Sequence, residues 1–188
     1  MLESLKWRGC LPWVKRLNPW LMLAPVYSSL FVIVAYWLGH ERVIEKQGQE
    51  YLAIALIMVP TVILPYRYKV GHGPLYLILA FLAASLLYRE IHLPGTGNGV
   101  YVCLFIVMVW TVVWWSRIAP QLEEGRTFAL VAATLFTYFC SQVIARRVFR
   151  GIPGEQTLHV ELKEVAENMG HLLFIVTSLY GLRSTYRK

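Results

Sequence analysis

The residues that could perform chemistry gather in the last apolar stretch of the chain, LHVELKEVAENMGHLLFIVTSLYGL. In an α-helix, at about 100° per residue, its acids, amide and imidazole would share about one third of the circumference. The opposite side would be apolar. The polar side chains are Glu161, Glu164, Glu167, Asn168 and His171, followed by Ser178. This spacing predicts an amphipathic helix whose polar stripe faces the interior of a helical bundle or a wet cavity.

Metal binding is one chemistry that the spacing allows. Glu167 and His171 are four residues apart and Glu164 lies one turn earlier, so two helical ligands can reach one ion. Glu90 or His92 would be a third ligand and water a fourth, which is the open coordination of a hydrolytic site. A divalent metal ion is the one cofactor that the sequence suggests. Glu164 and Glu167 would then be catalytic, as ligands or general base of a metal-assisted membrane hydrolase acting on a lipid or lipid-linked substrate.

Anion binding is a second chemistry. Arg146 and Arg147 precede a glycine-containing loop, and Arg89 and Glu90 stand in the string YREIHLPGTGNG, on the same side of the membrane in the topology described below. Arginine side chains at this place could hold the phosphate of a lipid head group. The ligand-binding residues that we predict are Arg89, Glu90, Arg146, Arg147, Glu161 and Asn168.

Two further interpretations remain open. Buried Glu and His side chains are typical proton-relay groups, so the stripe also suits proton-coupled movement of a small solute. Alternatively, Arg89, Arg146 or Arg147 neutralises Glu164 or Glu167 and joins three helices without any reaction. The second interpretation follows because a carboxylate buried in a membrane must be paired or protonated.

The composition limits the class of protein. Of the 188 residues, 57% are hydrophobic and 15% are charged, against about 45–50% and about 25% in soluble domains. A soluble core could not hide that much apolar surface, so we predict an integral membrane protein. All eleven acidic residues are Glu, which excludes an aspartate nucleophile and a Ser-His-Asp triad. The serine-hydrolase pattern GxSxG and the P-loop pattern are also absent.

Six apolar stretches are near the length that crosses about 30 Å of hydrocarbon. They cover residues 19–39, 51–66, 74–88, 99–115, 127–144 and 158–182. Residues 1–18 interleave cationic with apolar and Trp side chains, which is typical of a segment at the membrane interface. We therefore predict an all-α polytopic membrane protein, with a six-transmembrane-helix bundle over residues 19–188 and an N-terminal interfacial amphipathic segment over residues 1–18.

The cationic residues predict the orientation. In this topology eleven of the 18 Lys and Arg fall on the side of the two termini, which places both termini in the cytoplasm of a multi-pass protein of the cell (inner) membrane. The net charge of +7 is then explained by cations that face anionic lipid, without a nucleic-acid partner. The partners that we predict are membrane lipids and, for a structural component, other membrane subunits.

The first function hypothesis is that the Glu/His/Arg cluster, on the extracytoplasmic side, binds a charged ligand. The ligand would be an anionic lipid head group or a metal ion, and the role transport-related or accessory. The alternative is the metal-assisted hydrolase, and the second alternative is a structural subunit of a larger membrane complex. The sequence leaves open whether the protein is an enzyme.

Overall fold

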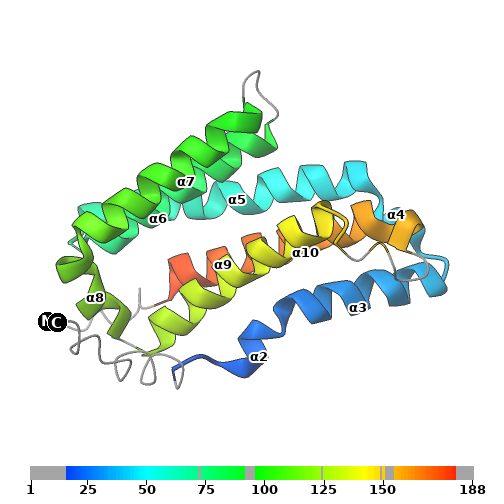
Figure 1. The fold of residues 1–188 in the computed structure, drawn as a ribbon, viewed down its shortest axis with the longest axis horizontal. Helices are drawn as coiled ribbons and strands as arrows, with labels where there is room; N and C mark the ends of the chain where they lie inside the picture. The colour runs from blue at the N-terminus through cyan, green and yellow to red at the C-terminus, as the bar shows by residue number, and fades with distance from the viewer. Residues whose placement is uncertain are drawn as a thin grey trace, which may run out of the picture.

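The computed structural model describes residues 16–71, 73–91, 96–123, 125–148, 150 and 155–180. Within this part of the chain there are helices and turns and no strand, which confirms the all-α prediction. The helices labelled in Figure 1 are α2 (Pro19–Met22), α3 (Ala24–Trp37), α4 (Glu41–Ile44), α5 (Lys46–Lys69), α6 (Pro74–Glu90), α7 (Thr96–Val113), α8 (Trp115–Glu123), α9 (Gly125–Ala145) and α10 (Glu155–Leu179). Of the interfacial segment predicted over residues 1–18, only residues 16–18 are described.

Helix α10, which carries the polar stripe, is the central helix of the bundle. It packs most extensively against α9 and also contacts α5 and α3. Helix α5 lies between α10 and α6, and α7 packs on α6 as the outermost layer (Figure 1). The stripe is therefore surrounded by other helices, as the sequence predicts.

The helices follow the predicted apolar stretches, with three differences. The first stretch is divided at Leu23, where α2 ends and α3 begins with a proline in its first turn. The second stretch is longer than predicted, because α5 continues through Pro60 and Pro65 over 24 residues. The fourth stretch bends by 86° between α7 and the additional helix α8. Ile118 and Leu122 are the buried residues of α8, so this short helix packs one apolar side on the end of the bundle.

Fewer helices are long and apolar enough to cross a membrane than the six spans that the sequence predicts. Among the described residues, α5 and α9 are long and apolar enough to cross a membrane, and the bent pair of α7 and α8 makes a third if it is one span. Helices α3 and α6 have only 14 and 17 residues, and the first half of α10 is charged. The six-span bundle is therefore not confirmed, although two or three spans are consistent with a membrane protein.

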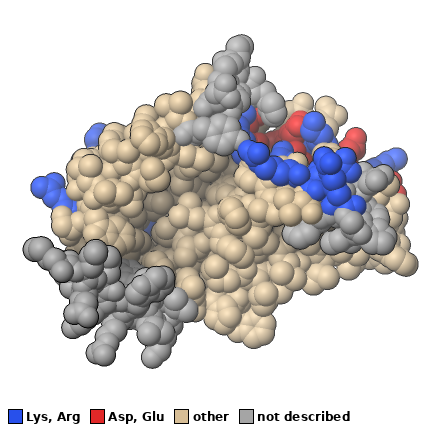
Figure 2. All heavy atoms as spheres, in the orientation of Figure 1, with Lys and Arg blue, Asp and Glu red and all other residues tan. Residues whose placement is uncertain are grey.

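The described structure is apolar on much of its outside and partly polar inside. Large apolar side chains that are more than half exposed include Leu30, Val34, Val62, Phe105, Val112 and Phe139. By contrast, the buried side chains include two Glu of α10, its Asn and its His. Figure 2 shows charged side chains toward the two ends of the visible face, with an uncharged surface between them. This distribution is the reverse of a soluble domain and is consistent with a lipid environment.

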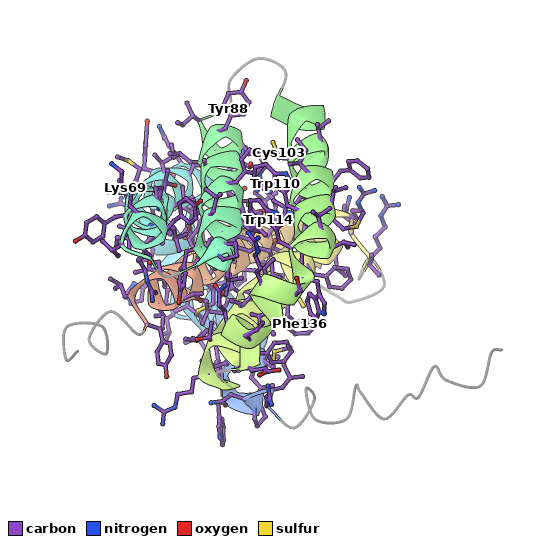
Figure 3. All side chains as sticks on the ribbon, turned by 90° about the vertical axis from the view of Figure 1, so that its left-hand side faces the viewer. Lys69, Tyr88, Cys103, Trp110, Trp114 and Phe136 are labelled. Carbon is purple, nitrogen blue, oxygen red and sulfur yellow. The ribbon has the colours of Figure 1, made fainter. Side chains whose placement is uncertain are left out.

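Aromatic side chains fix α7 against α6. Trp110 of α7 lies 5.3 Å from the ring of Phe81 on α6, and Trp114 stacks on Trp110 at 5.7 Å between ring centroids. Figure 3 shows α6 and α7 side by side, with Trp110 and Trp114 toward α6. This packing supports α6, whose last turn contributes Arg89 to the site described below.

Arg67 holds the C-terminal end of α10. Its side chain is 1% exposed, and its Nη1 donates to the carbonyl oxygens of Ser178 at 2.9 Å and of Tyr180 at 2.6 Å. The guanidinium also lies 3.9 Å from the centroid of the Tyr76 ring. A cation at this place satisfies carbonyls at the end of the helix and complements its dipole. Helices α5, α6 and α10 are thereby joined at the end opposite to the polar site.

Candidate ligand-binding site

Glu167 is the centre of the polar cluster. The residue is only 1% exposed. Its Oε1 accepts hydrogen bonds from Arg89 Nη2 of α6 and from Gln142 Nε2 of α9, the latter at 2.9 Å. One carboxylate oxygen thus connects three helices. Charge-assisted hydrogen bonds of this kind are stronger than neutral ones and offset part of the cost of burying the charge.

A second cation comes from α10 itself. Lys163 Nζ lies 2.8 Å from Glu164 Oε1 and 3.4 Å from Glu167 Oε2. Arg89 Nη2 is in turn 3.1 Å from Glu90 Oε1. The site therefore contains three buried carboxylates and two cations, and Figure 2 shows Glu side chains partly enclosed by Lys and Arg at this end. This set has one negative charge in excess.

Asn168 connects the cluster to α5. Its Nδ2 donates to the backbone oxygen of Gln49 at 3.0 Å and to Gln49 Oε1 at 2.7 Å. Both residues are buried. Because both donors of the amide have acceptors, the orientation of Asn168 is fixed, and its Oδ1 is left as an acceptor.

His171 lies deeper along α10 and is fully buried. Its Nδ1 is 2.6 Å from the hydroxyl of Tyr138 on α9, and the two rings meet edge to face. The ring of Tyr138 can approach this closely because residue 170 is glycine. A Cβ added to Gly170 would lie 3.0–3.1 Å from three atoms of that ring.

Polar contacts continue along the antiparallel pair of α9 and α10. Three side-chain pairs bridge the two helices: Gln142–Glu167, Tyr138–His171 and Thr134–Thr177. The last pair lies at 3.2 Å and is buried. Side-chain hydrogen bonds between helices are a usual means of association where water is excluded. The pairs therefore fix the register of α9 on α10 and so hold the site together.

Several buried atoms of α10 have no hydrogen-bond partner among the described residues. They are Glu161 Oε2, Glu167 Oε2, Asn168 Oδ1 and His171 Nε2. Glu167 Oε2 does have Lys163 as its ion-pair partner. Three of the four atoms are oxygens that can only accept. A buried polar atom without a partner costs about 1–3 kcal/mol, so this surplus of acceptors favours a ligand that donates or carries positive charge.

The structure brings together six of the site residues that the sequence predicts. Glu164, Glu167, Asn168 and His171 are buried on α10, and Arg89 and Glu90 meet them from α6. The ion pair between Arg89 and Glu167 is one of the pairings that the sequence left open.

The remaining predicted residues lie elsewhere or outside the described chain. Glu161 is half-buried at the edge of the stripe and lines a cavity of about 350 Å³ between α3, α4 and α10. Arg146 and Arg147 lie in the turn that follows α9. Lys163 and Arg89 form ion pairs with Glu164 and Glu167. His92 falls outside the described residues.

No metal centre is formed by the residues that the structure describes. They contain no group of three or more His, Cys or Glu side chains that could hold a metal ion. The predicted ligands Glu164 and Glu167 instead bind cationic side chains, and His171 binds Tyr138.

Sequence reasoning missed four residues that complete the site. They are Lys163, Gln142, Tyr138 and Gln49. A signal for two of them exists in α9, where polar residues recur at helical spacing from Thr134 through Tyr138 to Gln142. A polar face on a second apolar helix indicates a partner for the stripe of α10.

Comparison of the chain with protein-family models, with curated proteins and with solved structures finds no match. The site geometry therefore carries the functional argument.

Proposed function

We propose that the chain is a multi-span membrane protein in which the polar cluster of α10 binds a small cation, in a transport-related or accessory role. The membrane placement is supported by the two or three helices of sufficient length and apolarity and by the exposed apolar side chains. Shorter helices such as α3 and α6 would then cross with the help of their neighbours, because a bundle can locally thin the bilayer.

Labelling of single cysteines tests the topology. In a background with Cys10, Cys103 and Cys140 replaced by Ser, the two labelling variants are Arg42→Cys, in α4 just before α5, and Lys69→Cys, at the last residue of α5. A membrane-impermeant maleimide added to intact cells should label the extracytoplasmic position, which we expect to be residue 42, and not residue 69. Equal labelling of both positions in intact cells would contradict a span between them.

One observation carries the cation proposal: Asn168 Oδ1 and Glu167 Oε2 accept no hydrogen bond among the described residues, in a cluster where three carboxylates face two cations. Among the described residues, the charged side chains around Glu90 include Arg89, Lys163, Glu164 and Glu167. Two cations thus face three carboxylates, and a bound monovalent cation would make the cluster neutral. Neutral buried clusters are favoured because an unpaired charge in a low dielectric costs several kcal/mol.

A proton, an alkali-metal ion and an ammonium group share this chemistry. Glu167 Oε2 and Asn168 Oδ1 would accept hydrogen bonds from the ligand or coordinate it, and His171 Nε2 would be a third polar atom near it. The anionic head group predicted from Arg146 and Arg147 stays a prediction. No observation on the described residues favours the hydrolase.

Thermal unfolding of the detergent-purified protein tests the cation site. Melting would be followed at constant ionic strength in chloride salts of sodium, potassium, ammonium and the bulky N-methylglucammonium ion. We expect saturable stabilisation by one of the small cations, about 2.7 kcal/mol at a hundred times its dissociation constant. If the proton is the ligand, lowering the pH in N-methylglucammonium chloride should stabilise instead.

A matched pair of variants makes the test specific. Glu167→Gln removes the excess charge and should abolish the cation effect, whereas Glu123→Gln changes an exposed Glu at the other end of the protein and should leave it unchanged. Equal melting in every salt and at every pH would overturn the proposal. In that case the cluster is a structural ion-pair network, which is the alternative that the sequence left open.

A further inference from the structure

A cleft lined by both charged and apolar side chains lies at the end of the bundle opposite to the cation site. It has a volume of about 880 Å³ and is formed by residues 16–21, the start of α9 and the end of α10. The lining includes Arg16, Arg126, Trp20, Tyr180, Leu130 and Val176. None of the residues assigned to the cation site lines this cleft, so its chemistry is independent.

The mouth of the cleft is cationic. Arg16 and Arg126 line it, and its lining contains no acidic side chain among the residues that the structure describes. The Nη1 of Arg16 donates to the backbone oxygen of Glu123 at 3.2 Å, and its side-chain Cγ lies 3.8 Å from the position of a Cβ on Gly125. These contacts hold Arg16 beside Gly125, the first residue of α9, whose first-turn N–H groups add to the positive potential. The charge of the cleft is therefore complementary to an anion.

The walls of the cleft are apolar. Leu130 of α9 and Val176 of α10 line it toward the middle of the bundle. Trp20 at its edge is 71% exposed, and Tyr180 stands beside the C-terminal end of α10. Trp and Tyr next to arginine are typical of the level of lipid head groups. A ligand that fits this cleft is thus anionic at one end and apolar at the other.

We propose that this cleft binds a phospholipid with an anionic head group. Its phosphate would contact Arg16 and Arg126, and the start of an acyl chain would lie along Leu130 and Val176. Guanidinium groups suit phosphate because they donate two parallel hydrogen bonds. The inference uses the membrane placement proposed above and does not depend on the cation site.

Lipid binding to the full-length protein tests the proposal. Native mass spectrometry of the detergent-purified protein would measure affinity for phosphatidylglycerol and for phosphatidylcholine. We expect tight binding of phosphatidylglycerol, reduced about tenfold by Arg126→Gln, as for loss of one charge-assisted contact worth about 1.4 kcal/mol. Val176→Trp keeps every charge, fills the cleft and should also weaken binding. Glu167→Gln should leave lipid binding unchanged, which separates this test from that of the cation site.

Arg117→Gln is the matched control. It removes one positive charge from an exposed residue of α8 at the same end of the protein, outside the lining of this cleft. An equal loss of affinity in Arg117→Gln and Arg126→Gln would overturn the proposal, because binding would then follow net charge alone. Equal affinity for phosphatidylcholine, or equal binding of inorganic phosphate, would overturn it too. A gain in lipid affinity after deletion of residues 1–15 would assign the cleft to that segment of the chain instead.

Discussion

Arg89, in the last turn of α6, forms an ion pair with Glu167, 78 positions later in the middle of α10. The arginine is partly exposed, with 25% of its side chain accessible, whereas the glutamate is 2% accessible. The pair therefore joins a partly exposed residue at the end of α6 to a buried residue of α10. It links the last turn of α6 to the central helix, from which α6 is otherwise separated by α5, and it contributes to the electrostatic balance of the site.

Arg89→Met should destabilise the protein strongly. The substitution leaves Glu167 buried without its arginine, which costs about 3–5 kcal/mol for a broken buried pair. Arg89→Met combined with Glu167→Gln should recover much of this loss, because no charge is then stranded. The free energy of unfolding in mixed micelles measures both effects. Lys46→Met, which breaks the exposed pair of Lys46 with Glu50, should cost less than about 1 kcal/mol.

Tyr138→Phe should destabilise the protein, because it removes the hydroxyl that is the described hydrogen-bond partner of His171. Without the hydroxyl, both ring nitrogens of a fully buried imidazole lack a partner in the described structure. The expected loss is about 1–3 kcal/mol in the free energy of unfolding. Tyr68→Phe, at a tyrosine that is 44% exposed on α5, provides the control and should be near neutral. Equal effects of the two substitutions would mean that the Tyr138–His171 contact contributes nothing.

Gly170→Ala should disturb the same contact from the other side. The new methyl group would lie 3.0–3.1 Å from the Tyr138 ring, so the ring must move, at a cost of about 1–3 kcal/mol for overpacking. Gly48→Ala in α5 is the matched control, because nothing lies within 4 Å of its Cβ position. There the better helix propensity of alanine should stabilise by up to about 1 kcal/mol. Melting temperatures that rise in both variants would contradict the close packing at Gly170.

Arg67→Met should weaken the other end of α10. It removes both hydrogen bonds to the carbonyls of Ser178 and Tyr180 and the contact with the Tyr76 ring. Unsatisfied buried carbonyls predict a loss of at least about 2 kcal/mol in the free energy of unfolding. Lys69→Met removes a cation two residues away at an exposed position and should change stability by less than about 0.5 kcal/mol. A similar small effect at Arg67 would argue against its capping role.

The sequence predicted the polar stripe correctly because helical periodicity is a local property. Residues three and four apart lie on one side of a helix whatever surrounds it, and an acidic stripe in an apolar stretch has to face inward. The burial of Glu164, Glu167, Asn168 and His171 follows from these two rules. The positions of the long helices follow in the same way from apolar stretches.

The partners of the stripe on other helices could not be predicted, because they depend on how separate helices pack. Arg89, Arg146 and Arg147 were equivalent candidates in the sequence, and the structure pairs Arg89 with Glu167. Lys163 lies on α10 itself, where it contacts its neighbour Glu164 and, one helical turn later, Glu167.

Local sequence by itself thus determined the all-α class, the places of the apolar helices and the side of α10 that turns inward. Only the tertiary structure decided that Gln142 and Tyr138 of α9 and Gln49 of α5 complete the site. It also decided that the chain bends by 86° after α7. The physical reason is the separation along the chain over which each feature is determined. Helical periodicity depends on neighbours within one or two turns, whereas contacts between helices depend on the register and close packing of segments far apart in the chain.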